Sequence, residues 1–273
     1  MQWAGSKQRT LKHISELLPR DFHAYYEPFV GGGTLLLYLL DQNVLTEGQV
    51  FANDISRPLI ATFNNIKSNV EALIQHSEQE MFSAENSKVM YQVNRSQMNK
   101  LNRLNVDNVH IACLFIFLMA TCYNGVYQEN LKGEFNTPNG IYRPKRVLFN
   151  KDLLREASHA FRNYNVTFSS VDYVEALKDA QKGDFVFLDP PYEGCENSYA
   201  GVKFNRKEQE RVRDVFRDLC ERGCFVLLMN SCTDYIKELY AEYKQVPIPV
   251  IRTIGKNTAS KKIVKYELAI LNY

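Results

Sequence analysis

The sequence predicts an α/β fold in which a mostly parallel sheet is covered by helices on both faces. Short apolar segments alternate along the chain with segments of helical periodicity, and this alternation is typical of strands joined by right-handed helical crossovers. The stretch from about 67 to 147 breaks the alternation. We therefore expect one α/β unit, residues 1–66 and 148–273, that carries an inserted subdomain at 67–147.

The strands of this unit are predicted from apolar segments of suitable length that are rich in β-branched and aromatic residues. In chain order they are residues 25–29, 50–52, 166–168, 185–188, 225–228, 250–253 and 267–271. The loop between the last two, 254–263, leaves no room for a helix. We therefore expect these two strands to pair as an antiparallel hairpin.

Helical periodicity fills most of the intervals between the strands. These segments are 6–18, 34–40, 59–67, 151–162, 206–221 and 233–240, and within the insert 70–76, 87–100 and 108–121 follow one another with no strand between them. The end of the insert, 123–146, has strand-like residues around a turn at 130–133 and more turn residues at 138–140. This pattern predicts an exposed hairpin.

The composition excludes several classes of protein. With 273 residues, of which 45% are hydrophobic, the chain can bury a large core. The six cysteines contain no CxxC pair and have no histidines beside them at metal-ligand spacing, so we expect no metal site. The longest apolar run, 111–121, is too short to span a bilayer, and the N-terminus lacks the apolar stretch of a signal peptide. We expect a soluble cytoplasmic protein with no membrane partner.

The charge of the chain allows nucleic-acid binding without requiring it. The net charge is only +2. Residues 244–266, however, contain six lysines or arginines and no acidic residue, which suits a surface that follows phosphates. An ordinary solvated basic face is an equally good interpretation of this charge alone.

The strongest chemical motif is Asp189-Pro190-Pro191-Tyr192, which directly follows a predicted strand. It therefore lies at the carboxyl edge of the sheet, where α/β folds place their ligands. Two consecutive prolines have no amide donors, so the carbonyl oxygens and the Asp189 carboxylate can accept hydrogen bonds from an amine. The ring of Tyr192 can stack on the heterocycle that bears the amine. Such a site requires a base that has left its stack.

A second motif, from Glu27 to Gly33, is a strand that runs into a glycine turn and then a helix. Glycines at such a turn let the backbone approach a ligand closely near a helix N-terminus. A dinucleotide fingerprint would need glycine where Leu36 stands, so hydride-transfer cofactors are disfavoured. Asp54 ends the next strand, where a carboxylate can accept hydrogen bonds from ribose hydroxyls or cap a helix.

Taken in order, these motifs resemble the adenine-specific DNA methyltransferases of the Dam and DpnII-modification type, the D12 class. The resemblance spans nearly the whole chain. It implies a Rossmann-like methyltransferase sheet with a reversed final strand, S-adenosylmethionine as methyl donor, and direct transfer to N6 of a flipped adenine in a short palindromic site of double-stranded DNA. A restriction endonuclease acting on the same site is a candidate partner. The resemblance rests on Trp3-Ala4-Gly5-Ser6-Lys7, Glu27 to Gly33, Asn53-Asp54, the segment YNG…GEFN.PNG, and DPPY.

The resemblance also assigns roles residue by residue. Catalysis falls to Asp189, Pro190, Pro191 and Tyr192. Cofactor binding falls to Trp3, Lys7, Phe29, Gly31, Gly33, Asp54, Asp172, Tyr173 and Asp189. DNA contacts fall to Tyr123, Asn124, Val126, Gln128, Pro138, Ile141, Arg143, Ser260 and Lys261.

The chain departs from the family at two positions of the recognition hairpin. Gln128 and Ile141 stand where well-known members have arginines that pair with guanine, whereas Val126 and Pro138 keep the apolar contacts to thymine. Glutamine pairs with adenine and an aliphatic side chain packs on a thymine methyl, so both changes favour A·T outer pairs. Our hypothesis is a target such as AATT in place of GATC. Gln2 and Ser6 also differ, where lysine and glycine are common.

Two other functions fit parts of the sequence. An RNA or small-molecule amine methyltransferase would share the Pro-Pro-Tyr site, but a small substrate needs no recognition hairpin. A non-catalytic DNA-binding derivative of the fold would need neither the DPPY motif nor the glycine turn.

Overall fold

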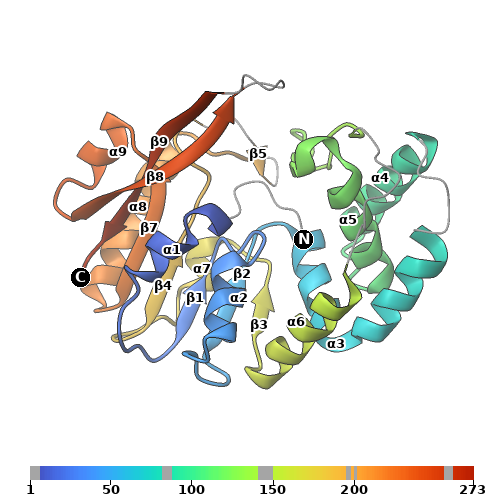
Figure 1. The fold of residues 1–273 in the computed structure, drawn as a ribbon, viewed down its shortest axis with the longest axis horizontal. Coiled ribbons are helices and arrows are strands. Elements are labelled where there is room, and N and C mark those ends of the chain that lie inside the picture. Colours follow the sequence, from blue (N-terminus) through green and yellow to red (C-terminus); the bar gives the residue numbers. More distant parts are fainter. Residues whose placement is uncertain (1–6, 82–87, 141–149, 195–197, 200–201, 255–260) are drawn as a thin grey trace.

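The central sheet of the computed structural model has seven strands in the order β3-β2-β1-β4-β7-β9-β8 (Figure 1). The structure describes residues 7–81, 88–140, 150–194, 198–199, 202–254 and 261–273. The sheet comprises β1 Tyr25–Glu27, β2 Val50–Asn53, β3 Thr167–Ser169, β4 Phe185–Leu188, β7 Phe225–Ser231, β8 Lys244–Ile254 and β9 Lys261–Leu271. A second, small antiparallel sheet of β5 Ser198–Tyr199 and β6 Val202–Lys203 was not predicted.

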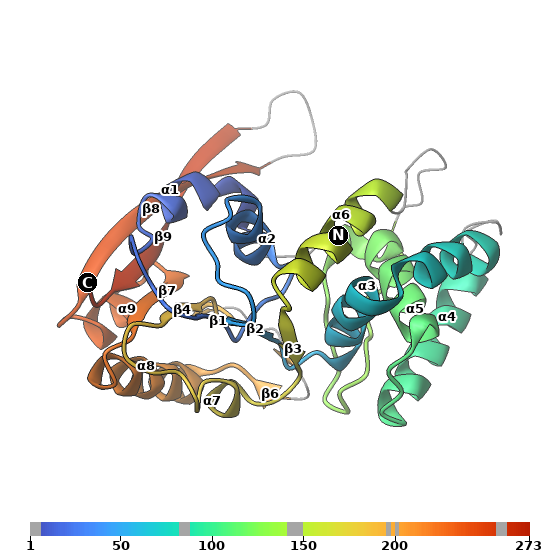
Figure 2. The same cartoon turned by 90° about the horizontal axis from the view of Figure 1, so that it is seen from below.

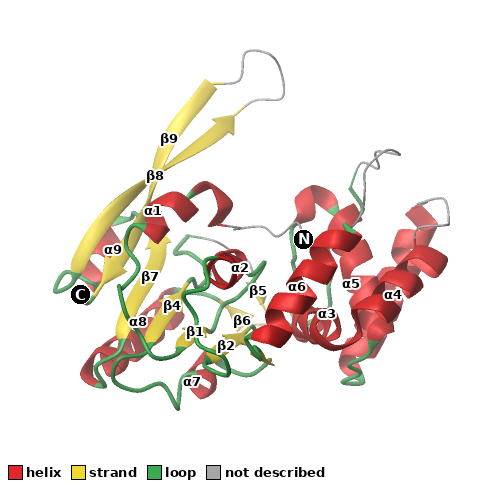
Figure 3. Cartoon of the chain, turned by 60° about the horizontal axis from the view of Figure 1, so that its bottom comes forward, coloured by secondary structure: helices red, strands yellow, loops and turns green. Residues whose placement is uncertain are grey.

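Strand direction confirms the predicted methyltransferase-type sheet. The strands from β3 to β7 pair in parallel, whereas β9 runs antiparallel to both β7 and β8. The last two strands form the predicted hairpin, which projects beyond the rest of the sheet (Figure 3). β8 begins at Lys244, well before the predicted start at 250. Pro247 and Pro249 fall within it, and prolines are tolerated there because β8 is an edge strand.

Helices cover both faces of the sheet (Figure 2). One face carries α1 Leu11–Ser15, α2 Thr34–Asp41 and α6 Lys151–Asn163, and the other carries α7 Tyr173–Ala176, α8 Arg206–Glu221 and α9 Asp234–Leu239. Strand β4 shows the two cores directly, because Phe185 and Phe187 join the first cluster while Val186 and Leu188 join the second. All four side chains are buried, as expected for a central parallel strand. The helix predicted at 6–18 is shorter, with a 3-10 turn η1 Lys7–Arg9 before α1.

A helical lobe stands beside the sheet and is built from α3 Arg57–His76, η2 Ser77–Met81, α4 Lys88–Arg103 and α5 Val109–Thr121 (Figure 1). The apolar run predicted to be too short for a bilayer is α5, which is almost wholly buried in the lobe. None of the helices in the described part of the chain is both long and apolar enough to cross a membrane. The segments predicted at 59–67 and 70–76 form one helix, α3, with non-helical backbone only at Asn69.

The proposed domain boundary at 66/67 therefore falls inside α3, close to this kink. The helix packs against α5 of the lobe and against α6, which covers the sheet. It thus belongs physically to both parts, and the division at 67–147 remains a prediction.

Residues 123–140, called the arm below, leave the C-terminal end of α5 and return to it, since the Gly140 amide donates to Thr121 O at 2.9 Å. They form the predicted hairpin: the Asn130 amide donates to Glu134 O at 2.9 Å and the Asn136 amide to Gln128 O at 3.0 Å, around the predicted turn. The described residues of the hairpin have no continuous strands, only the isolated bridges Cys122↔Asn139 and Glu129↔Phe135, after a 3-10 turn η3 Tyr123–Gly125. The strands are interrupted at Phe135 because both of its backbone groups bind the side chain of Asn99. The Phe135 amide donates to Asn99 Oδ1 at 2.9 Å, and its carbonyl accepts from Asn99 Nδ2 at 3.0 Å.

Candidate active site

The loop of residues 189–193, called the DPPY loop, follows β4 at the carboxyl edge of the sheet. The Asp189 carboxylate forms an ion pair with Lys7 Nζ at 2.7 Å. Lys7 is only 7% exposed, and its ammonium lies 4.8 Å from the ring centroid of Tyr192. The Tyr192 hydroxyl donates to Glu267 Oε2 of β9 at 2.9 Å. Residues from both ends of the chain thus hold this loop from two sides.

Burial governs the charge of this site. It raises the pKa of Asp189, and the neighbouring Lys7 ammonium opposes the rise. Glu27 of β1 is buried as well, which raises its pKa to about 8, although the Tyr25 hydroxyl donates to it at 2.8 Å. Asp189 Oδ1 is buried and has no hydrogen-bond partner among the described residues. Because an unsatisfied buried acceptor costs about 1–3 kcal/mol, this oxygen marks a place for a donor.

The glycine turn between β1 and α2 is fixed by Asp54. Gly31 and Gly33 have positive φ angles of 48° and 67°, which favour glycine. The Gly31 amide donates to Asp54 Oδ2 at 3.0 Å, and the Ser56 amide donates to Oδ1 at 3.0 Å. Burial raises the pKa of Asp54 to about 6, and these two amides oppose the rise. Asp54 therefore joins the end of β2 to the glycine turn and to the start of α3.

Asn53, directly before Asp54, ties three strand ends together. Its Nδ2 donates to Pro28 O and to Val171 O, both at 3.1 Å. Its Oδ1 accepts from Ser169 Oγ at 2.9 Å and from the Val171 amide at 3.0 Å. This positioning role was not predicted, although a polar residue at the buried end of an apolar strand was a usable signal.

Beside these strand ends lie Phe29, Asp172 and Tyr173, three of the residues predicted to bind the cofactor. The rings of Phe29 and Tyr173 are 5.0 Å apart, and the Arg211 guanidinium covers Tyr173 at 4.7 Å. Asp172 accepts two hydrogen bonds from Arg211, at 2.8 and 3.0 Å, and one from the Val174 amide at 2.9 Å. Asp172 is therefore largely occupied by protein donors in this structure, and its cofactor contact stays a prediction.

The arm presents the predicted DNA contacts on its outer side. Gln128 is exposed between buried Tyr127 and Glu129, and Tyr123 is 49% exposed beside exposed Asn124. Val126 is half-buried and Pro138 is exposed. These assignments stay predictions, and Trp3, Ile141, Arg143 and Ser260 lie outside the described residues; of Lys261 only the backbone, at the start of β9, is described.

A family model for D12 class N6 adenine-specific DNA methyltransferases matches residues 3–254, which include the glycine turn, the arm and the DPPY loop. The chain belongs to this family. It is 33% identical to the type II methyltransferase M.MjaIII of Methanocaldococcus jannaschii, covering 100% of this chain and 98% of the relative. It is 32% identical to the type II methyltransferase M1.LlaDCHI of Lactococcus lactis subsp. cremoris, covering 100% and 94%. The DNA adenine methylase of Escherichia coli strain K12 is 29% identical, covering 99% and 94%.

The D12 methyltransferase is thus an adenine-specific DNA-methylating enzyme, as the resemblance implied. Two of its buried residues beneath the DPPY loop were missed from the sequence. Gln209 of α8 and Asn230 of β7 are 0% exposed. Gln209 stands on the apolar stripe of α8 with Val212, Phe216 and Leu219. A polar residue on an apolar stripe was the signal that could have identified it.

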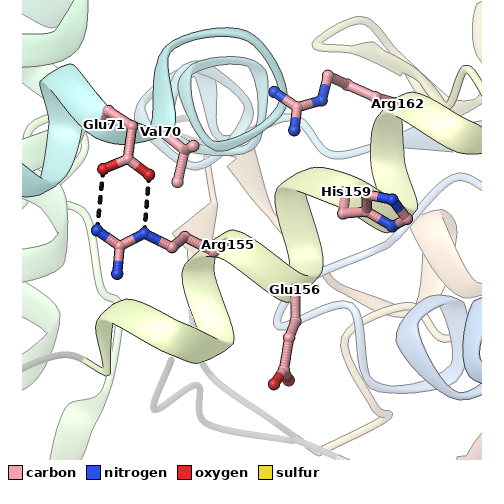
Figure 4. A pocket seen from close by; sticks show the side chains of 6 residues that line it. All are labelled: Val70, Glu71, Arg155, Glu156, His159 and Arg162. Carbon is pink, nitrogen blue, oxygen red and sulfur yellow. Dashed lines mark hydrogen bonds and ion pairs between the residues drawn. The ribbon is translucent and has the colours of Figure 1, made fainter.

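A depression of about 530 Å³ lies elsewhere on the D12 methyltransferase, between α3 and α6 (Figure 4). Its lining contains none of the predicted site residues, and Arg155 is held there by both carboxylate oxygens of Glu71, at 2.8 and 2.9 Å. Among the described residues, no cluster of histidine, cysteine, aspartate and glutamate is arranged to hold a metal ion. The depression is lined by Val70, Glu71, Arg155, Glu156, His159 and Arg162.

Proposed function

We propose that this methyltransferase transfers a methyl group from S-adenosylmethionine to N6 of an adenine flipped out of a short palindromic DNA site. The observation that carries the proposal is Asp189 Oδ1, a buried acceptor without a described partner beside the ring of Tyr192. An exocyclic amine is a donor, and the purine that bears it can stack on a tyrosine ring. The DPPY loop offers both features at one point.

The residues at the carboxyl edge fit S-adenosylmethionine as the donor. Asp189 and Glu267 bring two carboxyl groups to the DPPY loop against the one ammonium of Lys7, and this excess of acidic groups suits a cationic sulfonium. Ile55 and Val171 are 41% and 37% exposed at the ends of β2 and β3, and apolar side chains at this place suit a flat purine. When bound, S-adenosylmethionine supplies an electrophilic methyl group.

The chain's own residues then act on the target amine. Asp189 Oδ1 accepts one hydrogen bond from N6, and the carbonyl of Pro190, to which no described residue donates, accepts the other. With both hydrogens held, the nitrogen lone pair points away from the loop, toward the methyl donor. The methyl group would pass directly to N6 with no covalent enzyme intermediate, and the proton lost from N6 would pass to the Asp189 carboxylate that holds it and from there to solvent.

The arm supports a target with A·T outer pairs. Gln128 is exposed, while its neighbours Tyr127 and Glu129 are buried and linked by a hydrogen bond of 2.5 Å from the Tyr127 hydroxyl. Gln128 is thus presented on a fixed backbone, and a carboxamide pairs bidentately with adenine. Together with the aliphatic Ile141, this favours a site such as AATT over GATC. In this proposal residues 67–147 read the site, and residues 1–66 and 148–273 transfer the methyl group.

A restriction endonuclease that cuts the same site is the proposed partner, since two similar proteins are named type II methyltransferases. Methylation would protect the shared site by placing a methyl group where the endonuclease reads adenine.

The test is methylation of a random-sequence duplex library with labelled S-adenosylmethionine, mapped base by base. We expect modified adenines in one palindromic motif with A·T outer pairs. Modification confined to GATC would overturn the target sequence but keep the enzyme. Duplex binding without incorporation would favour a binding protein over a methyltransferase.

A further inference from the structure

The backbone of the DPPY loop has few groups with which the protein can hold it. Pro190 and Pro191 have no amide hydrogen, so the loop cannot be anchored by a normal ladder of amides. Two of its backbone groups are bound by buried side chains. The Pro191 carbonyl accepts from Gln209 Nε2 at 2.8 Å, and the Glu193 amide donates to Asn230 Oδ1 at 3.1 Å.

These two side chains also bind each other, because Asn230 Nδ2 donates to Gln209 Oε1 at 2.9 Å. The hydrogen bonds form a closed circuit that leaves the loop at Glu193, passes through Asn230 and Gln209, and returns at Pro191. Each member must donate and accept at the same time. A carboxamide does this, whereas a carboxylate cannot donate and an ammonium or guanidinium cannot accept. The circuit therefore explains why both positions carry amide side chains.

Burial makes this arrangement costly unless it is complete. Gln209 and Asn230 are 0% exposed, and their neighbours on α8 and β7 include Val212, Phe216 and Leu228 of the apolar cluster. A buried polar group without a partner costs about 1–3 kcal/mol, and an apolar residue would fill the same space without that cost. Asn230 Oδ1 also accepts from the Ser231 amide at 2.8 Å, which fixes the orientation of its amide.

The circuit determines which acceptors of the loop remain available. The Pro191 carbonyl is occupied by Gln209, whereas no described residue donates to the Pro190 carbonyl or to Asp189 Oδ1. We propose that Gln209 and Asn230 are positioning residues that hold the DPPY loop so that these two acceptors face the target amine. This inference rests on the proposed function and deepens it, because it assigns the geometry of that site to two residues outside the motif.

The test compares Gln209→Met with a matched control, Thr62→Val. Thr62 is also 0% exposed and also gives its side chain to a carbonyl, that of Pro58 at 2.7 Å, but it lies in α3. We expect the single-turnover methylation rate of Gln209→Met at saturating cofactor and DNA to fall about tenfold to a hundredfold. Its Kd for a duplex oligonucleotide and its KM for S-adenosylmethionine should stay within about twofold of wild type. Thr62→Val should lose comparable stability and keep its rate.

Hydrogen exchange of the peptide that contains Tyr192 and Glu193 gives a readout independent of turnover. We expect faster exchange of the Glu193 amide in Gln209→Met and in Asn230→Asp, which cannot donate to Gln209. In the double variant the losses of rate should be far from additive, since both act through one circuit. An unchanged rate in Gln209→Met with a melting temperature lowered as in Thr62→Val would overturn the proposal. If the wild-type protein methylates no DNA, the proposed function fails, and unchanged exchange at Glu193 in both variants would refute the circuit separately.

Discussion

The DPPY loop and the arm are both irregular segments at the same edge of the molecule, but the protein holds them in different ways. The loop is fixed by buried residues from three elements, Asn230 of β7, Gln209 of α8 and Lys7 of η1. The arm is fixed from the helical lobe, where Asn99 binds the backbone of Phe135 and the Tyr91 hydroxyl donates to Thr137 O at 2.8 Å. In the proposed function, the chemistry and the reading of DNA thus rest on largely different supports, which allows the recognition sequence to change while the transfer site stays intact. The two regions meet where Tyr127 and Glu129 of the arm lie beside Ser56 and Asp54.

The largest effect is expected from Asp189→Ala. The variant loses the buried acceptor for the target amine and leaves Lys7 without its carboxylate. We expect methyl transfer to fall by at least about a hundredfold to a thousandfold, while duplex binding, supported by the arm, is retained. Asp214→Ala on the exposed side of α8 is the control. Robust turnover of Asp189→Ala would show that Asp189 is not the acceptor of the target amine. It would also refute the view that the DPPY loop carries the chemistry while the arm carries DNA binding.

Gln128→Arg changes only the arm and tests its role in recognising the DNA sequence. Arginine pairs bidentately with guanine, so methylation should shift toward sites with a G·C outer pair by about 1–3 kcal/mol, or about five- to 150-fold in relative kcat/KM. The measurement is competition between AATT and GATC duplexes that differ only at these pairs. Lys132→Arg at the exposed turn of the arm adds the same side chain and should leave the preference unchanged. A changed site preference in Lys132→Arg, or an unchanged preference in Gln128→Arg, would contradict the proposal that Gln128 recognises the outer base pair.

Asn99→Ala removes the support of the arm without touching its outer face. Two hydrogen bonds to Phe135 are lost, each of about 1 kcal/mol. We expect the KM for DNA to rise about tenfold, while the rate at saturating DNA stays within about twofold. Gln97→Ala, an exposed change on the same helix, should leave both values unchanged. If Asn99→Ala instead lowers the saturated rate at constant KM, the two supports are coupled.

The effect of Glu27→Gln is expected in stability as a function of pH, apart from the comparison of the two regions. Burial raises the pKa of Glu27 to about 8 in the folded protein, against about 4.3 in an unfolded chain. Between these values the folded state binds a proton that the unfolded state has lost, so the free energy of unfolding falls as pH rises. Urea unfolding from pH 5 to pH 8 should show a shallower decline in Glu27→Gln. Glu221→Gln, at an exposed carboxylate, should follow wild type.

The sequence predicted the centre of the sheet well because β4 and most of β7 are buried on both faces and therefore largely apolar. β4 matched the prediction residue for residue, and the antiparallel pairing of β8 with β9 followed from a loop too short for a helix. β8 was predicted too short because Pro247 and Pro249 disfavour a strand in a sheet centre, and only the tertiary structure places them at an edge. The arm forms the predicted hairpin around 130–133, but its strands are interrupted because Phe135 binds a side chain of α4 with its backbone, and the sequence did not predict this contact.

The residues of the DPPY motif could be read from the sequence because their chemistry is unusual in itself. The roles of Asn53, Gln209 and Asn230 were missed, because a polar residue in an apolar strand or stripe is only a weak signal until the fold shows that it is buried and which groups it binds. Gln209 illustrates the difference: in the sequence it is one of several polar residues of α8, and in the structure it is 0% exposed with both ends of its amide bonded.

The two prolines of β8 also bear on how copies of this protein meet. Amides of residues two apart in a strand point the same way, and the pairing of β8 with β9 is continuous from Lys244↔Leu271 to Ile254↔Lys261. The missing amides of Pro247 and Pro249 therefore belong to the outer side. A strand from another chain that added there would find two donors absent, and the opposite border, β3, is only three residues long. Both borders of the sheet thus resist edge-to-edge pairing with another chain.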